Sequence, residues 1–231
     1  MRSWLKSAHW RTCKKRSTKT WRIREISTFR LASKRESADQ QALIRAGVAI
    51  TYAHWEGFIK AASENYLNFV NNQGHRYREL KICFVVFGMK GRLTVLGDSR
   101  KSKSSIEALE FVFSEMDKPA KMVLGSAIDT ESNLTSTVFS NIAQSIDIAV
   151  DQYETKFKLI DESLVNRRNS IAHGEYLDLN PAQFIGLVEE VLMLMRWYKT
   201  DLENAASQES YKRPPTEIEA AWRQRLRMAT P

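Results

Sequence analysis

The chain is organised around one stretch of ten residues, Arg167-Arg168-Asn169-Ser170-Ile171-Ala172-His173-Gly174-Glu175-Tyr176. On an α-helix, at about 100° per residue, Asn169 and His173 share a face and their side chains can touch. Arg168 and His173 are five residues apart and diverge by roughly 140° on a straight helix. They can therefore meet at one reacting atom only through the long arginine side chain, an unwinding helix end, or a second chain.

Gly174 indicates where this helix ends, because glycine is the residue that helices prefer just after their last turn. His173 then lies in the last turn, where the helix dipole favours the charged imidazole and the side chain can exchange protons near neutral pH. This combination makes Arg168, Asn169 and His173 a candidate site. A plain structural interpretation also fits, in which the cations cap a helix end and the glycine stops it.

Length and composition restrict the class of protein. A chain of 231 residues with 43% hydrophobic and 27% charged residues is long enough for one sizeable domain, or at most two small ones, of ordinary globular type. Cys13 and Cys83 are far apart and show no metal-ligand spacing, so we expect a reducing, cytoplasmic location and no metal site. The longest apolar run, Ile82–Phe87, is too short to span a bilayer, and no motif for a cofactor is present.

The positive charge is concentrated in residues 1–36, which we predict to be a flexible basic arm. Residues 1–35 hold twelve Lys and Arg and one acid, whereas residues 36–231 hold 23 basic and 26 acidic residues. Such an arm is typical of contacts with phosphate backbones or anionic surfaces, and its tryptophans can stack on bases. The composition also resembles a transit peptide, and it fits equally well a solubilising tail or a start codon placed too far upstream.

Helical periodicity dominates the rest of the chain and predicts an all-α fold. Apolar residues recur at three- and four-residue steps over 37–71, 106–117, 134–146, 157–173 and 181–206. The apolar run at 82–87 fits either a strand or a helix, and its helical neighbours favour a helix. Residues 97–105 are expected to be a surface loop. We therefore predict one helical domain over 37–206 and a polar tail with one weak helix over 207–231.

Two features of these helices concern the site. Glu56 borders the apolar stripe of the first helix, where a carboxylate often orients an arginine, so it is a candidate partner of Arg168. In the motif helix, the side chains expected to be buried are Ile160, Leu164, Val165, Ile171 and Ala172.

Four blocks of the sequence resemble a known family. Arg168 and His173 match the R-x(4–6)-H signature of HEPN-domain ribonucleases. Three further blocks are similar to the prokaryotic HEPN-like nucleases named for their association with RNA ligase and phosphatase modules: Tyr52-Ala-His-Trp-Glu-Gly-Phe-Ile-Lys60, Ile128-Asp-Thr-Glu-Ser-Asn-Leu134 and Leu159-Ile-Asp-Glu-Ser-Leu164. The signature alone is weak evidence, but four blocks in the right order, within roughly residues 37–211, are specific. The basic arm is not part of this pattern.

The resemblance implies a helical bundle that dimerises so that the motif helices of two protomers face each other. It also implies a metal-independent RNase without cofactors, with RNA as substrate and an antitoxin or another defence component as partner. Members are often toxins or anti-phage effectors. A related HEPN group has a modified tyrosine two residues after the motif histidine. This chain has Glu175 there and Tyr176 one position later, so the modification is not carried over.

These expectations assign a role to each residue. His173 would act as base in one protomer and as acid in the other, Arg168 would stabilise the charged phosphorane, and Asn169 would orient the imidazole. Arg167 is expected to contact a phosphate, with Glu56 and Tyr176 in support. The alternative is an inactive HEPN module that binds nucleotide or RNA within a larger complex. A DNA-binding helical protein is disfavoured, because the basic charge lies in the arm and no recognition-helix pattern is present.

Overall fold

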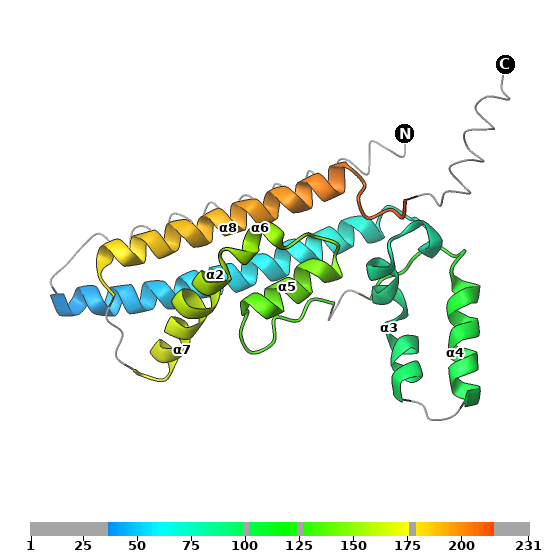
Figure 1. Ribbon diagram of the computed structural model, residues 1–231, viewed down its shortest axis with the longest axis horizontal. Helices are drawn as coiled ribbons and strands as arrows, with labels where there is room; N and C mark the ends of the chain where they lie inside the picture. The colour runs from blue at the N-terminus through cyan, green and yellow to red at the C-terminus, as the bar shows by residue number, and fades with distance from the viewer. Residues whose placement is uncertain (1–36, 99–101, 124–126, 176–178, 215–231) are drawn as a thin grey trace, which may run out of the picture.

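The computed structural model describes residues 37–98, 102–123, 127–175 and 179–214 (Figure 1). These residues form helices joined by loops, with only isolated bridges between extended residues, so the predicted all-α class is confirmed. The predicted basic arm, the weak helix after residue 214 and Tyr176 lie outside the described residues. None of the described helices is both long enough and apolar enough to cross a membrane.

Two long helices form the centre of the helical bundle. α2 (Ser37–Asn71) and α8 (Pro181–Ser207) lie side by side and run in the same direction (Figure 1). Their axes approach closely where Gly47 faces the Phe184 ring, since a Cβ added at Gly47 would lie 2.4 Å from Phe184 Cζ. Further along, the hydroxyls of Ser63 and Tyr198 lie 2.7 Å apart in the buried interface.

Shorter helical segments cover one side of this pair (Figure 1): α5 (Ser136–Ser145), α6 (Asp151–Glu154), the π-helix η2 (Leu159–Asn166) and α7 (Arg167–Ala172). They are attached through an aromatic cluster around Phe139. The Phe139 ring lies 5.4 Å from Trp55, 5.0 Å from Tyr153 and 5.5 Å from Tyr198, measured between ring centroids. Large rings buried in this way contribute much of the apolar area of a core, so this cluster joins α5 and α6 to both long helices.

A helical hairpin projects from one end of the bundle (Figure 1). It consists of α3 (Ile82–Asp98) and α4 (Ser102–Glu115), preceded by the one-turn helix η1 (Tyr77–Glu79). The apolar run at 82–87 is therefore helical, as its neighbours suggested. The loop predicted over 97–105 is too long, because α3 continues to Asp98 and α4 already begins at Ser102.

The motif helix differs from the single α-helix predicted over 157–173. Its central part is the π-helix η2, whose hydrogen bonds span five residues instead of four, and α7 follows directly. Ile160, Leu164 and Val165 are buried as predicted, but Ile171 is only half-buried and Ala172 is exposed. A π-helix turns through a smaller angle per residue than an α-helix. A set of buried positions predicted at α-helical spacing is therefore wrong for the residues that follow it.

The packed part of the described structure extends beyond residue 206. Asn180 caps α8 and pairs reciprocally with Gln183. After α8, Tyr211 is buried against Phe69, with ring centroids 6.0 Å apart, and its carbonyl accepts a hydrogen bond from the Lys81 amide. Residues up to Tyr211 therefore belong to the packed structure and not to a solvated tail.

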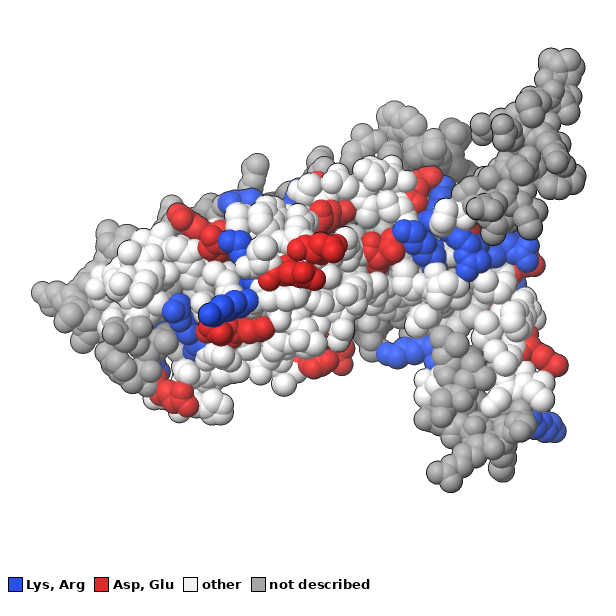
Figure 2. Space-filling view, viewed as in Figure 1, with Lys and Arg blue, Asp and Glu red and all other residues white. Residues whose placement is uncertain are grey.

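Charged side chains of both signs are interspersed over the face shown in Figure 2. Several form ion pairs between segments, including Lys156 with Glu190 at 2.6 Å and Lys81 with Asp147. This agrees with the nearly balanced count of 23 basic and 26 acidic residues over 36–231. The excess positive charge of the chain belongs to the segment before residue 37.

Candidate active site

The end of α7 places His173 at a fixed point on the surface. Gly174 has φ +77° and ends the helix as predicted. Its amide donates to the Ile171 carbonyl at 3.1 Å, and the Glu175 amide donates to the Ser170 carbonyl at 2.9 Å, which together form a Schellman motif. The His173 side chain is exposed at this end, while its amide donates to the Asn169 carbonyl at 2.9 Å. The imidazole is thus accessible on a well-defined backbone.

The Arg168 side chain points back into the bundle. Its Nη1 donates to Oδ1 of Asn169 at 2.9 Å and to Oδ1 of Asn133 at 3.2 Å. Its Cζ lies 4.9 Å from the centroid of the Tyr52 ring, close enough for a cation–π contact. The guanidinium is therefore held by three different segments of the chain.

Tyr52 connects this arginine to α2 and to the loop before α5. Its hydroxyl accepts a hydrogen bond from the Leu134 amide at 2.8 Å. Burial raises the pKa of this hydroxyl, and the nearby Glu56 carboxylate raises it further, while the Leu134 bond and the Arg168 charge act in the opposite direction. The phenol stays neutral at physiological pH and serves as a rigid platform for the guanidinium.

The loop that carries Asn133 is fixed from the other side by Asp161 of η2. One carboxylate oxygen accepts from the Ser136 amide at 2.7 Å, and the other accepts from the Ser136 hydroxyl at 2.5 Å. A carboxylate at this place satisfies a free amide at the start of α5 and is favoured by the helix dipole. The loop is therefore attached to η2 after Asn133 and to Tyr52 at the neighbouring Leu134.

The structure brings some of the predicted site residues together and leaves others apart. Arg168 and Asn169 are in contact. Among the described residues, no side-chain bond joins Asn169 to His173, because the Asn169 amide oxygen is turned toward Arg168. Arg168 faces the bundle and His173 faces solvent, in line with their divergence on a helix. Within the described part of the chain, no hydrogen bond joins these two side chains.

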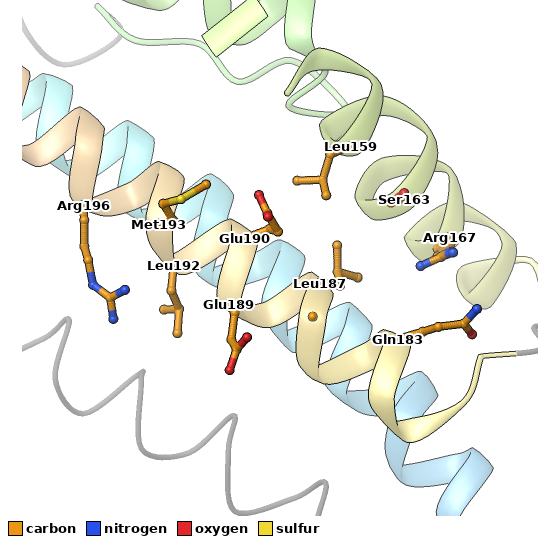
Figure 3. Close-up of a pocket in the computed structure, with 11 residues that line it drawn as sticks. Leu159, Ser163, Arg167, Gln183, Leu187, Glu189, Glu190, Leu192, Met193 and Arg196 are labelled. Atoms are coloured by element: carbon orange, nitrogen blue, oxygen red, sulfur yellow. The ribbon is translucent and has the colours of Figure 1, made fainter. Parts of the chain in front are cut away.

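Arg167 lines a groove on another side of the motif helix (Figure 3). The groove has a volume of about 780 Å³ and runs between η2, α7 and α8. Polar side chains of Ser163 and Gln183 lie near Arg167, and Leu159 and Leu187 contribute apolar surface. Arg167 and Arg168 thus lie in different surroundings, one in the groove and the other against Asn133 and Tyr52.

The remaining candidates are placed as follows. Glu56 is half-buried one turn after Tyr52, and within the described chain it forms no ion pair with Arg168, although both groups act on the Tyr52 hydroxyl. Tyr176 lies outside the described residues. The described residues on either side of 176–178 are bonded to α2. Arg45 Nη1 donates to the Glu175 carbonyl at 2.5 Å, and Gln41 donates to the Leu179 carbonyl at 3.3 Å.

Comparison with known proteins identifies the family. A family model described as RiboL-PSP-HEPN matches residues 17–204, which is more than half of the chain. The chain belongs to the RiboL-PSP-HEPN family. The match begins at residue 17, so it includes part of the basic segment 1–36, which was expected to lie outside the family pattern. Searches of curated proteins and of solved structures returned no match.

In this RiboL-PSP-HEPN domain, the sequence blocks that carried the resemblance meet around Arg168. Tyr52 comes from the first block, Asn133 from the second and Asp161 from the third. None of these three residues was predicted as a site residue. They could have been proposed as such, because each lies in one of the blocks that resemble the family.

HEPN domains are often RNases, so the family suggests a nuclease or RNA-binding role. In the part of the chain that the structure describes, no group of three or more His, Cys, Asp or Glu side chains is arranged to hold a metal ion. The side chains that the site offers are a guanidinium, an imidazole and two amides.

Proposed function

We propose that the protein is a metal-independent endoribonuclease of a prokaryotic toxin or anti-phage defence system. The observation that carries this proposal is that one helix presents both an exposed His173 and an Arg168 held by the amides of Asn133 and Asn169. An imidazole supplies proton transfer and a guanidinium supplies charge stabilisation, which are the two needs of phosphodiester transesterification. The RiboL-PSP-HEPN membership supports the same reaction.

The reaction is attack of an RNA 2′-hydroxyl on the adjacent phosphorus. One His173 removes the 2′-hydroxyl proton as the new O2′–P bond forms. The P–O5′ bond then breaks, and a second imidazolium gives its proton to the departing O5′. The products are a 2′,3′-cyclic phosphate and a 5′-hydroxyl end. Each proton transfer contributes a factor of about 10²–10⁴ to the rate.

Arg168 stabilises the extra negative charge of the phosphorane. A guanidinium can bind two phosphate oxygens through a forked pair of N–H groups, which suits a trigonal-bipyramidal phosphorus with several charged oxygens. Asn169 supports this role by holding Arg168, with its amide oxygen 2.9 Å from Nη1. This replaces the earlier expectation that Asn169 orients the imidazole.

The active unit is a homodimer in which the motif helices of two protomers face each other. Arg168 contacts the bundle while His173 is exposed at the helix end. This favours a composite site, in which two histidines from two chains supply an acid and a base. Arg167, in the neighbouring groove, would contact a phosphate next to the cleaved one.

The deciding experiment is incubation of the purified full chain with end-labelled RNA in the presence of EDTA. We compare the wild type with His173→Ala and Arg168→Ala, and use Arg78→Ala as the matched control, because Arg78 forms an exposed pair with Asp117 far from the motif. Cleavage by the wild type and Arg78→Ala alone, ending in cyclic phosphate, supports the proposal. Equal cleavage by His173→Ala contradicts it.

The second candidate is a HEPN module without catalytic activity that binds RNA or nucleotide in a larger complex. The observation that favours it is the exposed position of His173, whose side chain forms no hydrogen bond with the other described site residues. Expression in a bacterial host separates the two, since a free RNase slows growth in a His173-dependent way and a binding module does not.

A further inference from the structure

Among the described residues, the guanidinium of Arg168 donates hydrogen bonds through one nitrogen, Nη1. Nη1 carries two N–H groups, and each has an amide oxygen as partner, one on Asn133 and one on Asn169. Among the described residues, none accepts a hydrogen bond from Nη2 or Nε. A guanidinium has five N–H donors in a rigid planar fork. The Nη2–Nε edge is therefore left to bind a forked acceptor such as a phosphate.

The groups that hold Arg168 do not neutralise it. Asn133 and Asn169 offer uncharged amide oxygens, and the Tyr52 ring attracts the cation through its face. No carboxylate forms an ion pair with Arg168 in the described part of the chain, and Glu56 acts on Tyr52 instead. The arginine is thereby oriented while it keeps its full positive charge for an anionic ligand.

Asn133 is the better fixed of the two amides. Asn169 neighbours Arg168 on the same helix, whereas Asn133 reaches it from a loop 35 residues away. That loop is attached through the Leu134 amide to the Tyr52 hydroxyl and through Ser136 to Asp161. Asn133 thus sets the orientation of the guanidinium relative to α2 and η2.

We propose that Asn133 is a positioning residue, which orients Arg168 so that its Nη2–Nε edge receives a phosphodiester of the RNA. This inference rests on the proposed function and adds a residue to it. Asn133 acts through Arg168 and touches no reacting atom. Its amide must stay uncharged, because a carboxylate in its place would cancel the charge that Arg168 offers to the substrate.

The test compares three substitutions in the full chain. Asn133→Ala removes the acceptor, Asn133→Asp keeps its shape and hydrogen bond but adds a negative charge, and Ser132→Ala is the control at an exposed neighbouring position. We measure kcat and KM for RNA cleavage, together with the thermal unfolding midpoint. Both Asn133 variants should lose up to about 100-fold in kcat with an unchanged unfolding midpoint, and Ser132→Ala should match the wild type.

Asn133→Asp separates positioning from a merely structural role. A structural asparagine is replaced well by the isosteric aspartate, so wild-type kcat in Asn133→Asp overturns the proposal. A double variant adds a second criterion. In the Arg168→Ala background, Asn133→Ala should cause no further loss, because its effect passes through the arginine. Independent, additive losses also overturn it.

Failure of this inference can be told apart from failure of the proposed function. If the wild type cleaves RNA and the Asn133 variants are fully active, the proposed RNase activity is supported and the positioning role of Asn133 is contradicted. If the wild type does not cleave RNA, the proposed RNase activity is contradicted. In that case, titration with an RNA carrying a 2′-deoxy sugar at the scissile position decides the inference by itself: Asn133→Asp must weaken binding as much as Arg168→Ala, and unchanged binding overturns it.

Discussion

Asp161 of η2 accepts both a backbone and a hydroxyl hydrogen bond from Ser136 at the start of α5. This pair joins the segment before the motif to the loop that supplies Asn133. One carboxylate therefore stabilises a helix end and also fixes the surroundings of Arg168.

Substitution Asp161→Ala should destabilise the fold by about 0.5–2 kcal/mol, the usual cost of losing a side-chain cap at a helix start. Urea unfolding measures this change. Glu162→Ala is the matched control, because Glu162 is an exposed neighbour whose carboxylate lies 3.8 Å from Lys158 in a solvated pair. Equal stability of the two variants would mean that the Asp161–Ser136 pair does not anchor α5.

Gly47→Ala should destabilise the α2–α8 interface. The added Cβ would lie 2.4 Å from Phe184 Cζ and 2.9 Å from another ring atom, so the ring or the helices must move. Overpacking of this kind costs about 1–3 kcal/mol. Gly91→Ala, in α3, is the control, because none of the described residues beyond its neighbours and its own helix backbone has an atom within 4 Å of the added Cβ, and it should be neutral or slightly stabilising. Phe184→Leu should recover part of the loss in the Gly47→Ala background.

The sequence predicted the end of the motif helix, which depends on local chemistry. Gly174 acts within a few residues of itself, so its role is visible in one stretch of sequence. The π-helix over Leu159–Asn166 was not predicted. Its buried residues fit an α-helical pattern as far as Val165, and nothing in their identity reveals hydrogen bonds that span five residues.

The partners of Arg168 were beyond the reach of spacing arguments. Its contact with Asn133 spans 35 residues and depends on how α5 is attached to η2, which is a tertiary feature. Asn169, adjacent to Arg168, could be placed on the helix but not turned to the correct side, because its amide can bond either neighbour. Glu56 was placed in the right region, since both it and the arginine act on the Tyr52 hydroxyl.

The stability of the fold should decrease in alkaline solution because of its buried phenols. Burial raises the pKa of Tyr211 to about 12, from an ordinary value of 10.0, with the Glu209 carboxylate adding to the shift. Below pH 10 the contribution of this neutral phenol is fully present. As the pH rises from 10 to 12, the unfolded chain loses the proton first and the free energy of unfolding falls.

Tyr211→Phe tests this effect, because it keeps the ring that packs on Phe69 and removes the ionisable group. Urea unfolding at pH 9 and pH 11 should show a smaller loss of stability in the variant than in the wild type. The same alkaline loss in both proteins would assign it to other groups.

Gly174→Ala should weaken the fold and the activity together, because the backbone at this position has φ +77°. A residue with a Cβ pays about 1–2 kcal/mol in the left-handed region, and the two Schellman hydrogen bonds that end α7 are strained with it. The end of the helix then no longer holds His173 at a fixed point, so cleavage should fall more than the loss of stability explains. Asn tolerates this conformation better than Ala, and Gly174→Asn should therefore retain more of both properties.

The control is Gly74→Ala, at another glycine with a positive φ of 71°, far from the motif. It should lose stability without loss of kcat. Equal kcat in Gly174→Ala and Gly74→Ala would show that the position of His173 does not depend on this helix end.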